Sequence, residues 1–162
     1  MGCDIHVYVE YNQFKPGRPA YWNNFGGCIN PGRDYDIFAK LAGVRSENQP
    51  LVPVRGIPDD TGHVCTSDYW IYINDSVKED EYSCSQTTAA SWHANGRKYK
   101  QNALGSDRWI EHPDWHSASW LTVGEFREAT QTGDIEYAAL VAAAQTLQRG
   151  GNEVRIVFWF DN

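Results

Sequence analysis

The chain has 162 residues, of which 41% are hydrophobic and 22% charged, and it carries a formal net charge of −7. A chain of this length can bury a core without disulfides or structural metals, so we predict one domain over 1–162. The acidic balance excludes binding to duplex DNA or RNA through phosphate contacts. No apolar run of about 18 residues and no leader pattern occurs, so we predict neither a membrane span nor a signal peptide and expect a cytoplasmic protein.

The four cysteines, Cys3, Cys28, Cys65 and Cys84, are scattered along the chain. None of them forms a CxxC pair. This spacing argues against a zinc ribbon, a thioredoxin-type motif and a secreted disulfide framework. Reduced thiols are therefore expected.

The first predicted element is a strand over 2–10, in which apolar and polar residues alternate. Its faces are Cys3, Ile5, Val7 and Val9 on one side and Asp4, His6, Tyr8 and Glu10 on the other. Residues i and i+2 of a strand point the same way. Asp4 and His6 can therefore present a carboxylate and an imidazole to one ligand.

A loop, a short helix and a second loop are predicted next. The segment 15–27 is rich in Gly, Pro and Asn and indicates a loop. Asp34 can cap a helix over 36–42, which Gly43 would end. Three prolines make 49–60 an extended loop. We expect 62–105 to be an irregular insertion that covers the core and contains one strand at 69–73.

The C-terminal third has the clearest local signals. Thr122 and Glu125 form a capping-box pattern that opens a helix ending near 130. A second helix is predicted over 135–149, followed by a buried strand over 153–160 that should pair beside the first strand. The order of elements predicts an α+β fold, with a mainly antiparallel sheet that includes both terminal strands and helices on one face.

The pattern of Asp4 and His6 recurs as Asp114-Trp115-His116. If the two pairs meet, Asp4, His6, Asp114 and His116 could bind one divalent metal ion, or two, of the kind used in phosphoester hydrolysis. The same four residues could instead act as acid–base groups without metal, each carboxylate orienting its imidazole. A third interpretation is that both histidines are hydrogen-bonded for packing. Additional candidates for this site are His63, His93, His112, Asp59 and Asp60.

Two further segments have the composition of a binding site for a small anion. The first is Arg55-Gly56-Ile57-Pro58-Asp59-Asp60, in which Arg55 could hold a phosphate. The second runs from Ser117 through Ser119 and Trp120 to a predicted helix N-terminus, which favours an anion. The alternatives are a proline-stiffened turn with solvated charges and ordinary capping by Thr122.

Four blocks of the sequence together resemble a family of functionally unassigned bacteriophage and prophage proteins that begin with the same hexapeptide. The blocks are 1–6, 33–39, 55–60 and 116–122. The resemblance implies a phage protein in the host cytoplasm and no particular reaction. The blocks contain both Asp/His pairs and the Arg55 loop.

These features predict a phage accessory protein that binds and hydrolyses a small phosphate-bearing nucleotide, such as a host cyclic-dinucleotide defence signal. Such an anti-defence enzyme would be a metal-assisted phosphodiesterase, with a tryptophan stacked on the base. One alternative is a non-catalytic protein that sequesters the nucleotide in a pocket made by homo-oligomerisation. The other is a protein-interaction or virion-associated module.

Overall fold

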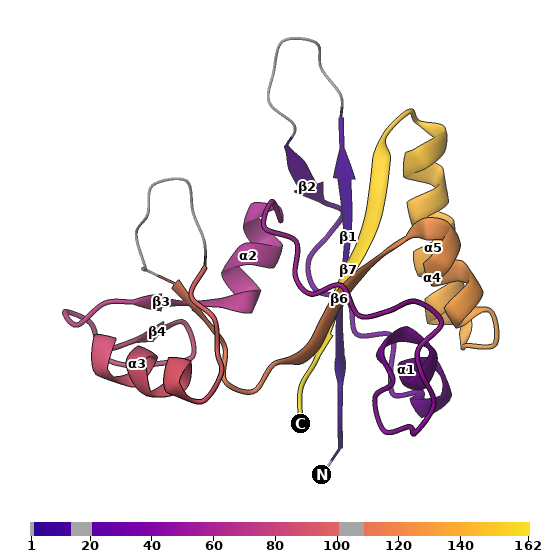
Figure 1. Cartoon of the computed structure of the whole chain (residues 1–162). Helices are drawn as coiled ribbons and strands as arrows, with labels where there is room; N and C mark the ends of the chain where they lie inside the picture. The colour runs from indigo at the N-terminus through magenta and orange to yellow at the C-terminus, as the bar shows by residue number, and fades with distance from the viewer. Residues whose placement is uncertain (1, 14–20, 101–108) are drawn as a thin grey trace.

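The computed structural model describes residues 2–13, 21–100 and 109–162, which form two β-sheets and the helices around them (Figure 1). Sheet A has the strand order β2-β1-β7-β6, and sheet B has the order β4-β3-β5. The strands are β1 (Ile5–Asn12), β2 (Trp22–Asn24), β3 (Trp70–Ile73), β4 (Ser83–Cys84), β5 (Trp109–Glu111), β6 (His116–Thr122) and β7 (Glu153–Phe160). The helices are α1 (Tyr35–Ala42), α2 (His63–Tyr69), α3 (Gln86–Ala94), α4 (Val123–Thr130) and α5 (Ile135–Arg149).

The centre of sheet A is the antiparallel pair of the first and last strands. The register runs from Ile5 opposite Phe160 to Asn12 opposite Glu153. This confirms the predicted pairing of the two terminal strands, and β6 adds to the other side of β7. Consequently the two chain ends lie side by side (Figure 1).

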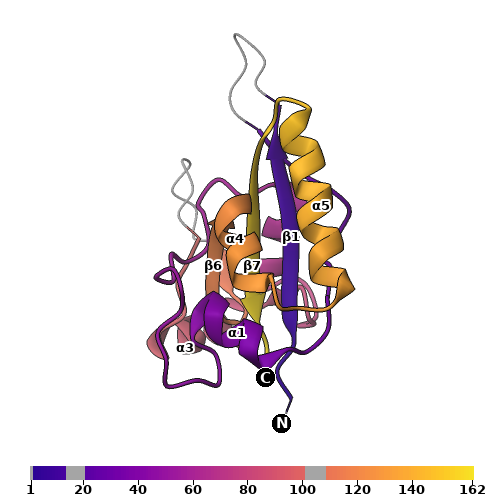
Figure 2. The same ribbon diagram turned by 90° about the vertical axis from the view of Figure 1, so that its right-hand side faces the viewer.

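Helices α1, α4 and α5 cover one face of sheet A, as the α+β prediction requires (Figure 2). The predicted caps are confirmed: Asp34 accepts hydrogen bonds at the start of α1, Gly43 ends that helix at φ 68°, and Thr122 and Glu125 form the capping box of α4. The buried side chains between these helices and the sheet include Ile5, Val7, Phe38, Phe126, Tyr137, Phe158 and Phe160.

The opposite face of sheet A packs against α2, with sheet B beyond it (Figure 1). Within the predicted insertion, β3 confirms the strand expected at 69–73, whereas α2, β4 and α3 correct the expectation of irregular structure in the rest of 63–94. β4 is only two residues long and α3 buries only Ala89, so neither has a clear periodic signal in the sequence. The end of the predicted insertion, 101–105, lies outside the described residues. In the described part of the chain, no helix has the length and apolarity needed to cross a membrane.

Candidate thiol site

The two predicted Asp/His pairs do not meet, because their imidazoles lie on opposite faces of sheet A. The His6 ring lies 5.9 Å from the Trp159 ring, whereas the His116 ring lies 5.9 Å from the Phe160 ring. Consecutive residues of a strand face opposite ways. A β-bulge between His116 and Ser119, with Ser117 at φ 52°, sets which face His116 takes.

The two aspartates of these pairs are also apart. Asp4 accepts two hydrogen bonds from Arg33, at 2.6 Å and 2.9 Å, and this pairing lowers the pKa of Asp4. The Arg33 guanidinium lies against Gly2, so that a side chain there would displace it. Asp114 is exposed on the loop before β6. Within the described ranges, no three His, Cys, Asp or Glu side chains stand close enough to bind one metal ion, so the predicted ligand set is not assembled.

The predicted anion-binding residues are partly brought together, but their charge is already paired. Arg55 donates to both Glu125 carboxylate oxygens, at 2.9 Å and 2.6 Å, and lies 4.5 Å from the Trp120 ring centre. Its backbone N–H donates to Ser119 Oγ at 3.0 Å. Arg55 lowers the pKa of Glu125 to about 2. The Arg55 guanidinium is therefore already bound to a carboxylate in the first turn of α4.

The remaining predicted residues divide between two places. Arg55, Asp59, His116 and Ser117 line one hollow of about 390 Å³. His116 Nδ1 lies 3.0 Å from Ser117 Oγ. Asp60 lies outside this hollow, where it binds Arg155 at 2.8 Å.

His6, in contrast, connects a thiol to a carboxylate. Its Nδ1 lies 3.5 Å from Cys28 Sγ, and its Nε2 lies 2.9 Å from Asp161 Oδ2. Cys28 is exposed, while Cys3, Cys65 and Cys84 are buried. A Cys–His–Asp chain of this kind recurs in unrelated nucleophilic enzymes and is recognised by its geometry.

Cys28 reaches His6 because the chain after β2 returns to β1. Val7 and Ile29 exchange backbone hydrogen bonds of 2.9 Å and 2.8 Å, which places Cys28 opposite Tyr8 and diagonal to His6. Between the pair Glu10–Asn24 and the pair Val7–Ile29, β1 advances three residues and the facing chain five. The two extra residues are Gly26 and Gly27, and Gly26 has φ 77°. This glycine bulge projects the thiol from the sheet edge.

Asp161 is fixed by the end of the β1–β7 ladder. Its Oδ1 accepts the backbone N–H of Asp4 at 3.0 Å, and its own N–H donates to the Asp4 carbonyl at 3.1 Å. With one oxygen held by the backbone, the other points to His6. The carboxylate thus orients the ring so that Nδ1 faces the thiol.

Two indole rings pack against the imidazole. The His6 ring centre lies 4.8 Å from that of Trp115 and 5.9 Å from that of Trp159, and the two indole rings are 6.2 Å apart. Burial alone would lower the pKa of His6, but Cys28 and Asp161 outweigh it and raise the pKa above the usual value of 6.5. The Cys28 and Asp161 side chains therefore make His6 a stronger base than a free imidazole, which suits it to accept a proton.

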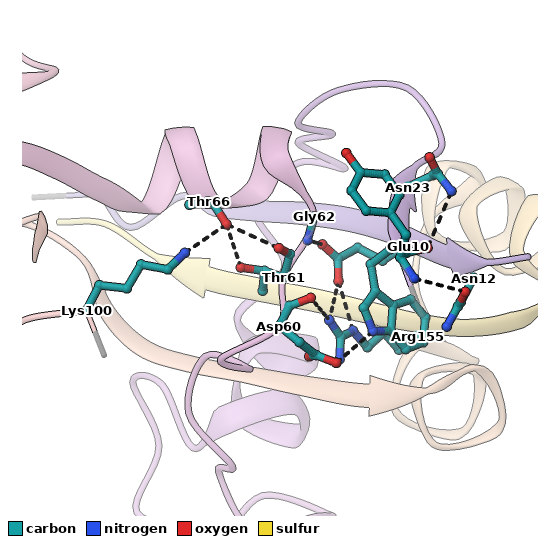
Figure 3. A network of polar contacts seen from close by, with 11 residues as sticks. Glu10, Asn12, Asn23, Asp60, Thr61, Gly62, Thr66, Lys100 and Arg155 are labelled. Atoms are coloured by element: carbon teal, nitrogen blue, oxygen red, sulfur yellow. Dashed lines mark hydrogen bonds and ion pairs between the residues drawn. The ribbon is translucent and has the colours of Figure 1, made fainter. Parts of the chain in front are cut away.

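A buried ionic network holds the strand that leads to Cys28 (Figure 3). Glu10 is fully buried and accepts from Arg155 at 2.8 Å and from the Gly62 backbone at 2.7 Å. Arg155 also binds Asp60 and lies 3.9 Å from the Trp22 ring centre. Because Trp22 belongs to β2, the network anchors β2 and the 60–62 loop to the sheet.

The thiol opens into a hollow of about 240 Å³ between the two sheets. Its walls are aromatic and acidic, and they include His6, Tyr8, Cys28, Asp68, Trp70, Glu81, Tyr82, His112, Trp115 and Trp159. Tyr8 donates a hydrogen bond to Asp68 at 2.7 Å. Burial, together with Cys28 and Asp68, raises the pKa of Tyr8, so its hydroxyl stays protonated.

Sequence reasoning found His6 but missed Cys28 and Asp161. The available signal for Cys28 was the Gly26-Gly27 pair before it in an aromatic loop, which is typical of a projecting turn. Asp161 has no local signal, since its role depends on strand pairing. Searches of protein-family models, curated proteins and solved structures gave no match to this chain. The function is therefore inferred from the geometry of the site.

Proposed function

We propose that this protein is a cysteine hydrolase that cleaves an acyl bond, with Cys28 as nucleophile. The observation that supports it is the chain of contacts from Cys28 Sγ to His6 Nδ1 and from His6 Nε2 to Asp161. The exposed thiol at the mouth of a hollow is accessible to a substrate.

In the proposed reaction, His6 takes the Cys28 proton and the thiolate attacks the substrate carbonyl. A carbon–sulfur bond forms, and the bond to the amine or alcohol leaving group breaks as His6 returns the proton to that group. Water, deprotonated by His6, then hydrolyses the thioester to release the acid and restore the thiol. Asp161 keeps the imidazole oriented and stabilises its charge.

The intermediate also needs a donor for its oxyanion. The backbone N–H of Cys28 has no acceptor within the ranges that the structure describes, and it belongs to the nucleophile itself. A nucleophile's own N–H is a common oxyanion donor. Nucleotide hydrolysis stays a prediction, and it is less well supported, because Asp4 is paired with Arg33 and Arg55 with Glu125.

A panel of small amide, ester and thioester substrates tests the proposal. We expect Cys28→Ser to lower kcat/KM about 10³-fold or more, and intact-mass spectrometry of the wild type to detect a thioester adduct during turnover. Cys84→Ser is the matched control, since that thiol is buried in sheet B, and it should leave the rate unchanged. Turnover by Cys28→Ser at the wild-type rate would exclude Cys28 as nucleophile.

A further inference from the structure

The hollow beside Cys28 has an electrostatic character that points to its ligand. Among the described residues that line it, Asp68 and Glu81 are acidic and neither Lys nor Arg occurs. The only basic side chains in its wall are His6 and His112, and burial lowers the pKa of His112. The two carboxylates would repel an anionic substrate and attract a cation.

The aromatic part of the wall suits the same ligand. Trp70, Trp115 and Tyr82 offer ring faces or edges to the hollow beside the two carboxylates. Ammonium groups bind such faces through the ring quadrupole, with an energy that grows as water is removed. Aromatic walls combined with carboxylates therefore favour an amine over a neutral polar group.

A separate observation indicates a ligand with an acceptor as well. Trp159 lines the hollow and is fully buried, yet its indole N–H has no hydrogen-bond partner among the described residues. Buried donors are rarely left unpaired. A ligand carbonyl oxygen that reached this N–H would supply the missing acceptor.

The position of Asp68 fixes how far the amine stands from the reacting carbon. Asp68 accepts from the Tyr8 hydroxyl at 2.7 Å, and the Cys28 thiol interacts with the same hydroxyl. One phenol hydroxyl thus separates the carboxylate from the thiol. An amine on the carbon next to the scissile carbonyl spans this short separation, whereas the amine of a lysine side chain lies several bonds farther away.

We infer that the hollow binds a free α-amino group, so that the substrates of this site are aminoacyl amides or esters with an unblocked amino end. Asp68 and Glu81 are the residues that determine this specificity. The inference rests on the proposed hydrolase function for its reaction and on the hollow for its selectivity. The volume of about 240 Å³ suits a ligand of amino-acid size.

Three coumarin amides with one leaving group test the inference: alanyl, propanoyl and Nα-acetyl-lysyl. The alanyl and propanoyl groups differ only by the α-amine. The Nα-acetyl-lysyl group carries its ammonium at the end of the side chain, farther from the scissile carbonyl. We expect kcat/KM for alanyl to exceed that for propanoyl by about tenfold or more. The ratio of kcat/KM for alanyl to kcat/KM for propanoyl should fall about tenfold in Asp68→Asn and in Glu81→Gln. Glu128→Gln is the control: it removes the same charge from α4 and should leave this ratio unchanged.

A binding experiment separates this inference from the proposed function. The binding of alaninamide and of propanamide to the Cys28→Ser variant is measured through the change in tryptophan fluorescence. Preferential binding of alaninamide without turnover by the wild type would support the amine site and overturn the hydrolase. Equal turnover of alanyl and propanoyl substrates, or a preference for Nα-acetyl-lysyl, would overturn the α-amine site and leave the hydrolase standing. Equal binding with no turnover would overturn both.

Discussion

At the scale of single residues, His6 is the centre of the site. It is held between Asp161 and Cys28, and the rings of Trp115 and Trp159 lie around it. Of the four residues predicted from the Asp/His pairs, His6 alone contributes its side chain here. Asp4 contributes through its backbone, which fixes Asp161.

Asp161→Asn should lower the pKa of His6, because a negative partner of the imidazolium is removed. In the wild type the folded pKa is raised above 6.5, so the stability from this pair is fully present below that value and is lost as pH rises through the folded pKa. The variant should lose stability at low pH, by about 1 kcal/mol or less, and little at high pH. NMR titration of the histidine ring protons and urea unfolding at two pH values measure both effects. An unchanged His6 titration would mean that Asp161 does not hold the imidazolium.

At the scale of elements, the site depends on how β2 and the chain after it are attached to β1. The Gly26-Gly27 bulge and the Val7–Ile29 bridge bring Cys28 into position. The network of Glu10 and Arg155 holds the preceding strand, and its carboxylate and guanidinium are almost completely shielded from water. A buried ionic pair resists loss of either partner, since the other is left uncompensated.

Glu10→Gln should lower the free energy of unfolding by about 3–5 kcal/mol, since it leaves Arg155 with less compensation in the interior. Glu125→Gln is the matched control: its pair with Arg55 is partly exposed and should cost about 1 kcal/mol or less. Urea unfolding followed by tryptophan fluorescence compares the two. Equal losses would show that burial of the Glu10 pair has no energetic consequence.

At the scale of the whole molecule, each face of sheet A is covered by a different layer of structure. Helices α1, α4 and α5 build the core on one face, and α2 with sheet B builds the other side (Figures 1 and 2). The thiol hollow lies on the second side, between the two sheets. The net charge of −7 surrounds it with a field that attracts cations.

This electrostatic attraction predicts that kcat/KM for a cationic substrate depends on salt concentration. The kcat/KM for the alanyl substrate should fall roughly threefold between about 20 mM and 500 mM salt, because screening weakens the attraction of a cation. The neutral propanoyl substrate is the control and should change little. Steady-state rates over a salt series measure the effect. The same salt dependence for both substrates would exclude electrostatic attraction as its cause.

The parts of the fold that the sequence predicted are those with local signals. Asp34, Gly43 and the capping box of Thr122 and Glu125 act within one helical turn, so α1, α4 and α5 were found close to their true bounds. Alternation in 2–10 and the aromatic run at 153–160 identified β1 and β7. In sheet B, the aromatic and β-branched run at 69–73 identified β3, whereas β4 and β5 lacked such signals because they are only two and three residues long.

By itself, the sequence determined the helices and strands that carry local signals, and that His6 belongs to the first strand, because these depend on contacts between near neighbours. Only the tertiary structure decided that His6 meets Cys28, 22 positions away, and Asp161, 155 positions away. It also decided that His116 faces the helices, since a one-residue bulge reverses which side of a sheet a side chain takes. Strand register and bulges arise from pairing between distant segments, and a local pattern of residue types does not encode them.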